Sequence, residues 1–440
     1  MTGLDVAVVV AFNGLLIVAM WVRHGGLNGL SGPSAQLTAL GQVTALLGTY
    51  AALIQIALMT RSPWLEQILG LDGLARWHHW LGFACFSLIG AHVVATTAGY
   101  AVGDGSSIPS EFWTLMTTYP YMLTATVGTG LLVVVVVTSI DAARRRLRHE
   151  TWHLIHLCAY LSVALAFGHQ LAVGTDLTSD PVARGYWCFL YAAVVGLILV
   201  FRVGQPLHLA GRHRLRVTST VTEAPGVVSI HIGGRQLDRL AVAPGQFFRW
   251  RFLTRDGWWH AHHFSLSAPP DGRHLRITVK GVGAHTQAVG TLRAGTRVIA
   301  EGPYGHFTAV RRRHKRVLLV AGGVGITPMR ALLDDLPRGR DAVVLIYRAG
   351  SEKEVLFRAE LENLFRERGG RLHLIVGHRR SPELPTDPLS PAMLRRLCPD
   401  ADQRDVYICG PQGMTDHVVE GLLAIGVAPE QIHRERFAVL

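Results

Sequence analysis

Six apolar segments, each close to the length of a membrane-spanning helix, constrain this 440-residue chain more than any other feature. They cover approximately residues 4–22, 37–59, 80–99, 121–140, 152–173 and 186–203. A helix needs about 20 apolar residues to cross the hydrocarbon core of a bilayer. We therefore expect six membrane-spanning helices before about residue 203. No basic residue precedes the first segment, which carries the acidic Asp5 at its start, and no small-residue cleavage site follows it. We therefore interpret it as a retained helix rather than a signal peptide.

The arginines beside these segments predict the orientation of the chain, because basic residues are enriched in cytoplasmic loops. One side carries Arg61, Arg76, Arg144, Arg145, Arg146, Arg148 and Arg202, and the other carries Arg23 and Arg184. The first side is therefore expected to be cytoplasmic. This places the N-terminus and the second half of the chain on the cytoplasmic face of the cell membrane.

Charge and cysteine content narrow the class of protein. The net charge is +12, but only 3 of the 43 basic residues are lysine, which is typical of an arginine-rich genome. No basic stripe is interleaved with aromatic residues, so we expect no nucleic-acid partner. The five cysteines are scattered without a C-x-x-C pair. This pattern argues against an iron–sulfur cluster, a structural zinc site or a disulfide framework.

The pattern changes after about residue 202. Short alternating runs at 214–220, 227–232, 246–252 and 275–280, separated by turn signals, are typical of a small antiparallel barrel. Apolar strands at 317–320, 342–347, 372–376 and 406–409 alternate with helix-like stretches such as 354–367, which is typical of a parallel sheet flanked by helices. We therefore predict a multidomain membrane protein: an all-α six-helix transmembrane bundle at 1–205, an antiparallel β-barrel domain at 206–312, and an α/β nucleotide-binding domain at 313–440.

Four histidines accompany the third and fifth apolar segments. Histidine at membrane depth is unfavourable unless it is bonded, so four of them suggest two metal centres. His78 and His92 are 14 residues apart, which separates them by about 40° around an ideal helix. His156 and His169 are 13 residues apart, or about 140°, so this pair requires helix distortion or two centres approached from different sides.

Counting spans makes the two helices run in the same direction. His78 and His156 are then towards the cytoplasm, and His92 and His169 are towards the outside. We expect one b-type haem at each level, held by two imidazoles, which leaves no open iron position and favours electron transfer. For any single histidine the alternative is an interhelical hydrogen bond. His79 and His153 remain alternative ligands.

Several short motifs follow in the second half of the chain. They are His262-His263-Phe264-Ser265-Leu266-Ser267, then Lys280-Gly281-Val282-Gly283 with His285-Thr286, then Gly302-Pro303-Tyr304-Gly305, and then Gly322-Gly323-Val324-Gly325-Ile326-Thr327-Pro328 after an apolar strand. Glycines allow close backbone approach, Thr327 can cap a helix, and Pro328 suits a first helical turn whose free N–H groups attract a pyrophosphate. Cys409-Gly410-Pro411 ends a later strand, where ligands of open sheets bind.

The order of these motifs resembles the ferredoxin-reductase-type flavin and nicotinamide module. With the histidine-bearing helices, residues 40–440 resemble the transmembrane ferric reductase and NADPH oxidase family. The resemblance implies that His262, Phe264 and Ser265 hold FAD, with Ser265 near its reactive N5, and that Lys280, Gly281, Gly283, His285 and Thr286 lie near its phosphates. It also implies that Gly323, Gly325, Thr327 and Pro328 cradle the nicotinamide dinucleotide, close to Gly410 and Pro411, with Cys409 beside the nicotinamide ring.

Glu435 and Phe437 match the family's C-terminal Glu-x-Phe, where the aromatic ring would cover the flavin, although this chain continues to Leu440. The resemblance thus gives Ser265, Cys409 and Phe437 as candidate catalytic residues. Arg348 follows a strand at a position where a cation can pair with a 2′-phosphate, and Arg379 and Arg380 follow the next strand. We therefore expect NADPH as the donor, with NADH as the alternative.

The resulting hypothesis is an oxidoreductase that moves electrons from cytoplasmic NADPH through FAD and two haems to an acceptor outside the cell. The acceptor would be oxygen, giving superoxide, or a ferric chelate. One alternative is a membrane subunit that reduces a partner protein or a quinone. An alternative of another class is a nucleotide-binding transporter or sensor without haem.

Overall fold

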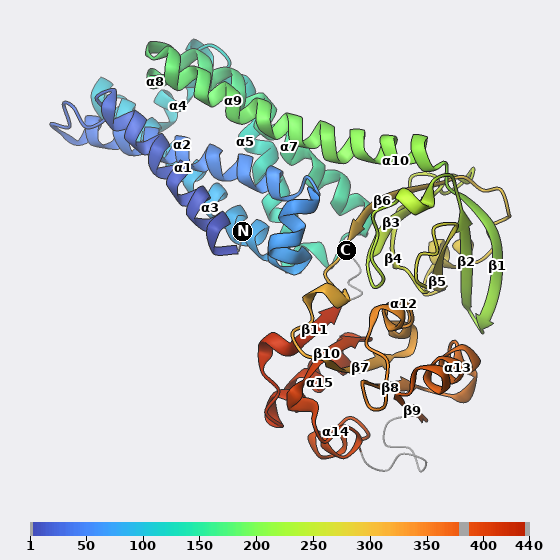
Figure 1. Ribbon diagram of the computed structural model, residues 1–440. Coiled ribbons are helices and arrows are strands. Elements are labelled where there is room, and N and C mark those ends of the chain that lie inside the picture. Colours follow the sequence, from blue (N-terminus) through green and yellow to red (C-terminus); the bar gives the residue numbers. More distant parts are fainter. Residues whose placement is uncertain (1–2, 378–386, 436–440) are drawn as a thin grey trace. The chain divides into compact units, whose positions relative to one another are not determined.

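The computed structural model describes residues 3–377 and 387–435 (Figure 1). Backbone contacts divide the chain into two compact units, Met1–Val203 and Gly204–Leu440. The first unit is helical, and the second contains all the strands of the described chain. The predicted division of the second half at residues 312 and 313 stays a prediction.

The first unit consists of nine α-helices and the start of a π-helix in the described chain. They are α1 (Gly3–Arg23), α2 (Pro33–Leu58), α3 (Pro63–Asp104), α4 (Ile108–Thr118), α5 (Met122–Ser139), α6 (Asp141–Arg144), α7 (His149–Val173), α8 (Thr175–Ser179), α9 (Pro181–Leu197) and the π-helix η1 (Ile198–Gly204). Six segments are long and apolar enough to cross a membrane: Gly3–Arg23, Pro33–Leu58, Gly73–Asp104, Met122–Ser139, Glu150–Val173 and Pro181–His213. The six predicted spans are therefore confirmed by length and composition.

Local sequence explains where these helices begin and bend. Proline occupies the first turn of α2, α3 and α9, where its missing N–H costs no helical hydrogen bond. Gly70 has a φ of 69°, and it bends α3 before the membrane-spanning part begins. Helix α2 packs extensively against α3, and α5 packs extensively against α7. These two helix pairs position the histidines.

The second unit begins with α10 (Gln205–His213) and continues into two three-stranded antiparallel sheets. Their strand orders are β1-β2-β5 and β4-β3-β6. The strands are β1 (Arg216–Ala224), β2 (Val227–Gly233), β3 (Phe247–Phe252), β4 (His262–Ser265), β5 (His274–Lys280) and β6 (Val298–Tyr304), with α11 (Ala284–Val289) after β5. Single antiparallel bridges, Arg216 with Arg297 and Leu266 with Ile277, connect the two sheets. Phe248 and Trp250 are fully buried between them.

A five-stranded parallel sheet completes the second unit, in the order β11-β10-β7-β8-β9. The strands are β7 (Arg316–Gly322), β8 (Val343–Ala349), β9 (Arg371–Val376), β10 (Arg404–Cys409) and β11 (Ile432–Glu435). The helices are α12 (Ile326–Leu332), α13 (Arg358–Arg368), α14 (Pro391–Leu397) and α15 (Gln412–Ala424). Short 3₁₀ turns occupy Leu237–Arg239, Ala309–Arg311, Gly323–Gly325, Leu333–Asp335, Glu352–Glu354, Ala401–Gln403 and Pro429–Gln431. The predicted combination of helical bundle, antiparallel sheets and α/β domain is confirmed.

In this sheet order, β7 and β10 are neighbours, and their carboxyl ends lie side by side at one edge of the sheet. The chain leaves β7 towards β8 and β9 and then returns to add β10 on the other side of β7. Connections therefore diverge at the carboxyl ends of β7 and β10, which is where ligands of open parallel sheets bind. The glycine motif at 322–325 and the Cys409-Gly410-Pro411 motif both lie at this edge.

Candidate functional site

The predicted histidines of α3 and α7 form two ring pairs. The ring centres of His78 and His156 are 5.9 Å apart, and those of His92 and His169 are 6.5 Å apart. A metal–imidazole bond is about 2 Å long, so two imidazoles on opposite sides of one metal have ring centres roughly 6 Å apart. Both pairs therefore have the spacing of two axial ligands. Helix α7 runs without a break from His149 to Val173, so helix distortion does not explain its 13-residue spacing, and two centres approached from different sides stay the prediction.

The number of ligands distinguishes between metals. No group of three or more His, Cys, Asp or Glu side chains suited to a metal occurs within residues 3–377 and 387–435. A structural zinc ion takes four protein ligands, whereas haem iron, already held by the porphyrin, needs only axial ones. Two facing histidines thus fit haem better than a bare metal ion.

The second ring nitrogens of these histidines differ in their surroundings. His92 Nδ1 lies 2.9 Å from the carbonyl oxygen of Gly41 and 3.2 Å from Thr96 Oγ1. His156 Nδ1 lies 3.3 Å from Ser139 Oγ. The Nδ1 atoms of His78 and His169 are buried without a hydrogen bond of good geometry. Partners on Nδ1 leave Nε2 as the nitrogen that can bind a metal.

The two alternative ligands lie elsewhere on the helix surfaces. His79 is exposed, and its ring contacts Trp80 and Phe83 of its own helix. His153 is also exposed, and its ring lies 6.4 Å from that of Trp152. The ring pair that joins the two helices at this level is His78 with His156, and this contact supports these two residues as the inner pair.

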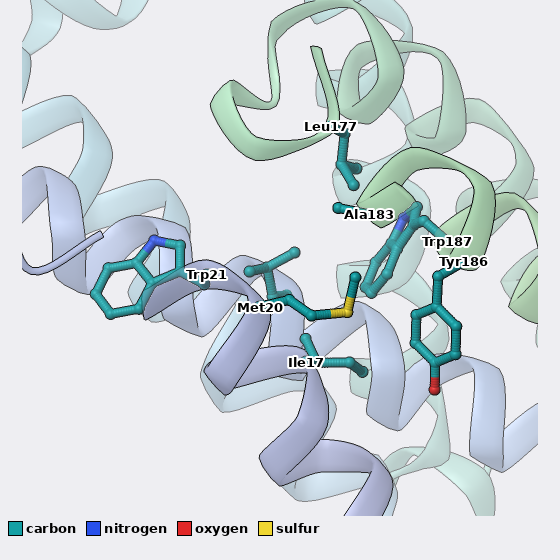
Figure 2. Close-up of a pocket in the computed structure, with 8 residues that line it drawn as sticks. Ile17, Met20, Trp21, Leu177, Ala183, Tyr186 and Trp187 are labelled. Carbon is teal, nitrogen blue, oxygen red and sulfur yellow. The ribbon is translucent and has the colours of Figure 1, made fainter. Parts of the chain in front are cut away.

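A small cavity in the first unit is unrelated to these histidines. Figure 2 shows Met20 and Trp187 on facing sides of it. Its lining residues are Ile17, Met20, Trp21, Leu46, Leu177, Ala183, Tyr186 and Trp187. Its volume of about 20 Å³ is enough for roughly one water molecule. No predicted site residue lines it.

In the second unit, strand β4 carries the predicted flavin residues. His262 pairs with Trp250 and Ser265 pairs with Phe247 across the β3–β4 ladder. The rings of His262 and Phe264 are 5.7 Å apart and nearly parallel because the two residues are two positions apart on one strand face. Trp250 Nε1 donates to the carbonyl of Phe264 at 2.9 Å, which fixes the strand from the buried side of the sheet. Ser265 itself is buried.

His260, which the sequence analysis did not identify, joins two predicted residues. Its ring centre lies 3.7 Å from that of His285. Burial, and then the neighbouring His260, His285 and Arg249, lower the pKa of His262 below its usual value. The group is therefore a neutral imidazole near pH 7, not a cation. The sequence signal that could have identified His260 is the cluster of histidines beside Phe264 and Ser265.

The loop after β5 uses the Thr286 hydroxyl internally. Thr286 Oγ1 accepts hydrogen bonds of 3.0 Å from the backbone N–H groups of Val282 and Gly283, and it donates to the carbonyl of Gly283. Lys280 is exposed at the end of β5. Thr286 thus shapes the loop, and Lys280 places an exposed positive charge beside it.

The carboxyl ends of β7 and β10 approach so closely that only glycine fits. A Cβ atom at Gly325 would lie 2.1 Å from the carbonyl oxygen of Cys409, and one at Gly410 would lie 2.6 Å from Met414 Cε. Thr327 is buried, and its hydroxyl donates to the carbonyl of Val324 at 2.9 Å. Thr327 therefore does not cap α12 through its side chain, contrary to the expectation, because the hydroxyl turns back to the preceding turn.

Cys409 and Glu435 are neighbours on the parallel strands β10 and β11. Burial, and secondarily the charge of Glu435, raise the pKa of the Cys409 thiol well above its usual range. Cys409 is thus a neutral, fully buried thiol at the edge where Gly325 and Gly410 meet. Phe437, Arg379 and Arg380 lie outside the described residues.

Arg348 lies near the carboxyl end of β8, as the sequence predicts. Its Nη1 donates to the carbonyls of Ala349 at 2.6 Å and Ile375 at 3.3 Å. Burial lowers the pKa of this guanidinium, and the charge of Asp387 opposes the shift. The remaining guanidinium nitrogens are the part of Arg348 available to a ligand.

Family models match both halves of the chain. Residues 44–167 match a model described as "Ferric reductase like transmembrane component". Three of the four paired histidines lie in this range, and His169 lies just beyond it. Residues 319–420 match "Oxidoreductase NAD-binding domain", which contains Gly323, Gly325, Arg348 and Cys409.

Individual relatives match about half of the chain. A flavohemoprotein of Vibrio cholerae serotype O1 is 34% identical over 217 residues, which are 47% of this chain and 53% of that protein. The ferredoxin reductase component of the 3-ketosteroid-9-alpha-monooxygenase of Mycolicibacterium smegmatis is 33% identical over 46% of this chain and 58% of its own length. The chain thus spans little more than half the length of these relatives.

A solved structure also matches about half of the chain. The flavohem-like FAD/NAD-binding domain of nitric oxide dioxygenase from Vibrio cholerae O1 biovar El Tor is 27% identical, with a TM-score of 0.41 over 51% of this chain and 98% of that domain. The matches to the two family models confirm the combination of domains expected from the sequence. The chain therefore joins a ferric-reductase-like transmembrane domain to an NAD-binding oxidoreductase domain of the FAD/NAD ferredoxin-reductase type.

Proposed function

We propose that this chain moves electrons across the cell membrane, from cytoplasmic NADPH, by way of FAD and two b-type haems, to an acceptor outside the cell. The observation that carries the proposal is the pairing of His78 with His156 and of His92 with His169 at 5.9 Å and 6.5 Å. Four histidines with separate structural roles have no reason to meet in two such pairs on the same two helices.

The histidines would act as axial ligands. His78 and His156 would hold the inner haem, and His92 and His169 the outer one. Two imidazoles per iron exclude a substrate from the metal, so this arrangement suits electron transfer better than catalysis at iron. The spacing of 14 residues from His78 to His92 corresponds to about 21 Å along a helix, so the two proposed sites would lie towards opposite faces of a bilayer.

The second unit would bind the donor side of the system. His262, Phe264 and Ser265 would hold the flavin ring, and Lys280 with the loop of Gly281, Gly283, His285 and Thr286 would lie near its phosphates. The edge formed by Gly323, Gly325, Thr327 and Pro328 with Cys409, Gly410 and Pro411 would take the nicotinamide dinucleotide. Flavin, when bound, accepts a hydride and passes electrons on singly, which links a two-electron donor to one-electron carriers.

Three features of the second unit support specific roles. The neutral His262 can pack against an uncharged ring without adding a buried charge. Gly325 is needed for the close approach to the Cys409 carbonyl, whereas nothing lies within 4 Å of a Cβ position at Gly323, so the open space for a ligand would be at Gly323. Arg348 would favour NADPH by pairing with its 2′-phosphate.

The absorbance spectrum of the purified full-length protein tests the proposal. We expect a Soret band that shifts when NADPH is added, and we expect His92→Ala to lose about half of the haem absorbance because one of two bis-histidine sites is removed. His79→Ala is the matched control, since His79 is exposed and lies next to His78. A colourless wild-type preparation would end the proposal in favour of a transporter or sensor without haem.

A second measurement identifies the acceptor. Membrane vesicles that oxidise NADPH are assayed in parallel for superoxide and for ferrous iron released from a ferric chelate. Formation of one product assigns oxygen or ferric chelate as the acceptor. If the haems are reduced and neither product forms, the acceptor is a partner protein or a quinone.

A further inference from the structure

Helices α2 and α3 approach each other closely beside His92. Gly41 of α2 is buried, and a Cβ atom there would lie 2.2 Å from Thr96 Oγ1 and 3.1 Å from the Thr96 backbone nitrogen. The second contact is tighter than an ordinary van der Waals contact and involves backbone, which a rotamer change does not move. The helix approach at this level therefore requires glycine at position 41.

This approach brings a carbonyl of one helix to the imidazole of the other. His92 Nδ1 lies 2.9 Å from the Gly41 carbonyl oxygen, and Thr96 Oγ1, one turn along α3, lies 3.2 Å from the same nitrogen. A carbonyl oxygen can only accept, so Nδ1 must carry the proton. Nε2 then keeps its lone pair, as a metal ligand requires.

The other three paired histidines have no Nδ1 hydrogen bond of good geometry to a backbone carbonyl in the described chain, although His78 lies near the carbonyl of Gln55 and His169 near that of Ala166. His156 Nδ1 lies 3.3 Å from the Ser139 hydroxyl, which can donate as well as accept. His78 and His169 have a buried Nδ1 without a hydrogen bond of good geometry. Among the described residues, His92 is thus the one predicted ligand of the four whose Nδ1 makes a hydrogen bond of good geometry to a backbone carbonyl.

We infer that Gly41 and Thr96 are positioning residues that make His92 the most strongly electron-donating of the four imidazoles. The inference rests on the proposed haem at His92 and His169. An imidazole that donates its Nδ1–H to a carbonyl becomes a more basic ligand, and a more basic ligand stabilises ferric over ferrous iron. The hydrogen bond therefore lowers the reduction potential of the outer centre and makes it a stronger reductant towards an external acceptor.

Three variants of the full-length protein test this inference by spectroelectrochemical titration. Gly41→Ala forces α2 away from Thr96, and we expect it to raise the midpoint potential of one haem while the other stays unchanged. Gly90→Ala is the matched control, because it adds the same methyl group to α3 two residues from His92, where nothing lies within 4 Å. Gly41→Ala combined with Thr96→Ala removes the 2.2 Å contact but keeps the 3.1 Å backbone contact and also removes the Thr96 hydroxyl, so we expect the potential to stay raised.

Thr96→Val keeps the inference testable if Gly41→Ala fails to fold. This change adds no bulk and removes only the second partner of His92 Nδ1, so we expect a smaller rise in the same potential. Unchanged potentials in Thr96→Val and Gly41→Ala, with both haems bound, would overturn the inference and leave the proposed function intact. A wild-type protein that binds no haem overturns the proposed function itself.

Discussion

Arg348 illustrates how the fold reduces what a predicted binding residue can offer. One terminal nitrogen is already bonded to the carbonyls of Ala349 and Ile375, so only the rest of the guanidinium can meet a phosphate. Those two bonds also hold the side chain at the carboxyl end of the sheet. A partly occupied arginine can therefore still be well placed to recognise a 2′-phosphate.

Exchanging Arg348 for glutamate should raise the Michaelis constant for NADPH at least about tenfold, because an attractive ion pair of 1.5–3 kcal/mol becomes a repulsion. The Michaelis constant for NADH should change much less, since NADH has no 2′-phosphate. Steady-state kinetics with both nucleotides measures the difference. Equal increases for the two nucleotides would contradict the assignment.

The Cys409 thiol is another residue whose chemistry depends on burial. It is fully buried, and burial together with Glu435 holds its pKa well above the usual range, so it is a thiol and not a thiolate at pH 8. We expect less than about one tenth of the iodoacetamide labelling in the native protein that is found after unfolding. Site-resolved mass spectrometry measures this ratio. Rapid native labelling at Cys409 would mean that the sheet edge opens to solvent.

At the scale of elements, ion pairs connect the antiparallel strands of the second unit to the helices of its parallel sheet. Glu360 of α13 accepts from Arg276 of β5 at 3.1 Å and from Arg330 of α12 at 2.5 Å. Arg276 also donates to the carbonyl of Ser267 and lies 4.7 Å above the Phe357 ring. One carboxylate thus holds the strand following the predicted flavin residues against the helix that follows the glycine motif.

Glu360→Gln should destabilise the second unit by about 1–3 kcal/mol, because two largely buried guanidinium groups lose a charged partner. Their side chains are only 14% and 10% exposed. Glu362→Gln is the control on the same helix, since its 3.9 Å pair with Arg358 is exposed and should contribute less than about 1 kcal/mol. The two variants are compared by thermal unfolding, with the release of flavin as the signal. Equal stability losses would show that Glu360 does not connect the two sheets energetically.

For the whole molecule, the asymmetric placement of arginines predicts the direction of electron flow. An even number of spans returns the chain to its starting side, so the N-terminus and the second unit are expected on the same, cytoplasmic, face. In the predicted orientation, NADPH would have access from one side of the membrane only.

Sealed membrane vesicles test this orientation. NADPH added to inside-out vesicles should reduce the haems at once, whereas right-side-out vesicles should respond only after detergent is added, because the charged nucleotide does not cross a bilayer. The haem absorbance of each preparation gives the result. Immediate reduction in sealed right-side-out vesicles would reverse the predicted orientation.

Much of the architecture follows from hydrophobic pattern alone. Six apolar segments are enough to predict the spans, because a bilayer fixes the length of each helix. Strong alternation likewise located β2, β3 and β5 to within a residue or two. Strand β4 was not predicted as a strand because His262 and His263 interrupt the pattern and it is only 4 residues long. Helix α13 begins at Arg358 and not at residue 354, because a 3₁₀ turn occupies Glu352–Glu354.

The sequence by itself determined the membrane spans, the two parallel histidine-bearing helices and the glycine motif of the nucleotide domain, since each depends on residues close together in the chain. Only the tertiary structure decided which carbonyl holds His92, how Thr286 and Arg348 are already bonded, and that His260 lies against His285. These contacts join residues that are far apart in sequence or depend on side-chain direction. Periodicity carries information about which face of an element is buried, but none about which atom of a neighbouring element meets it.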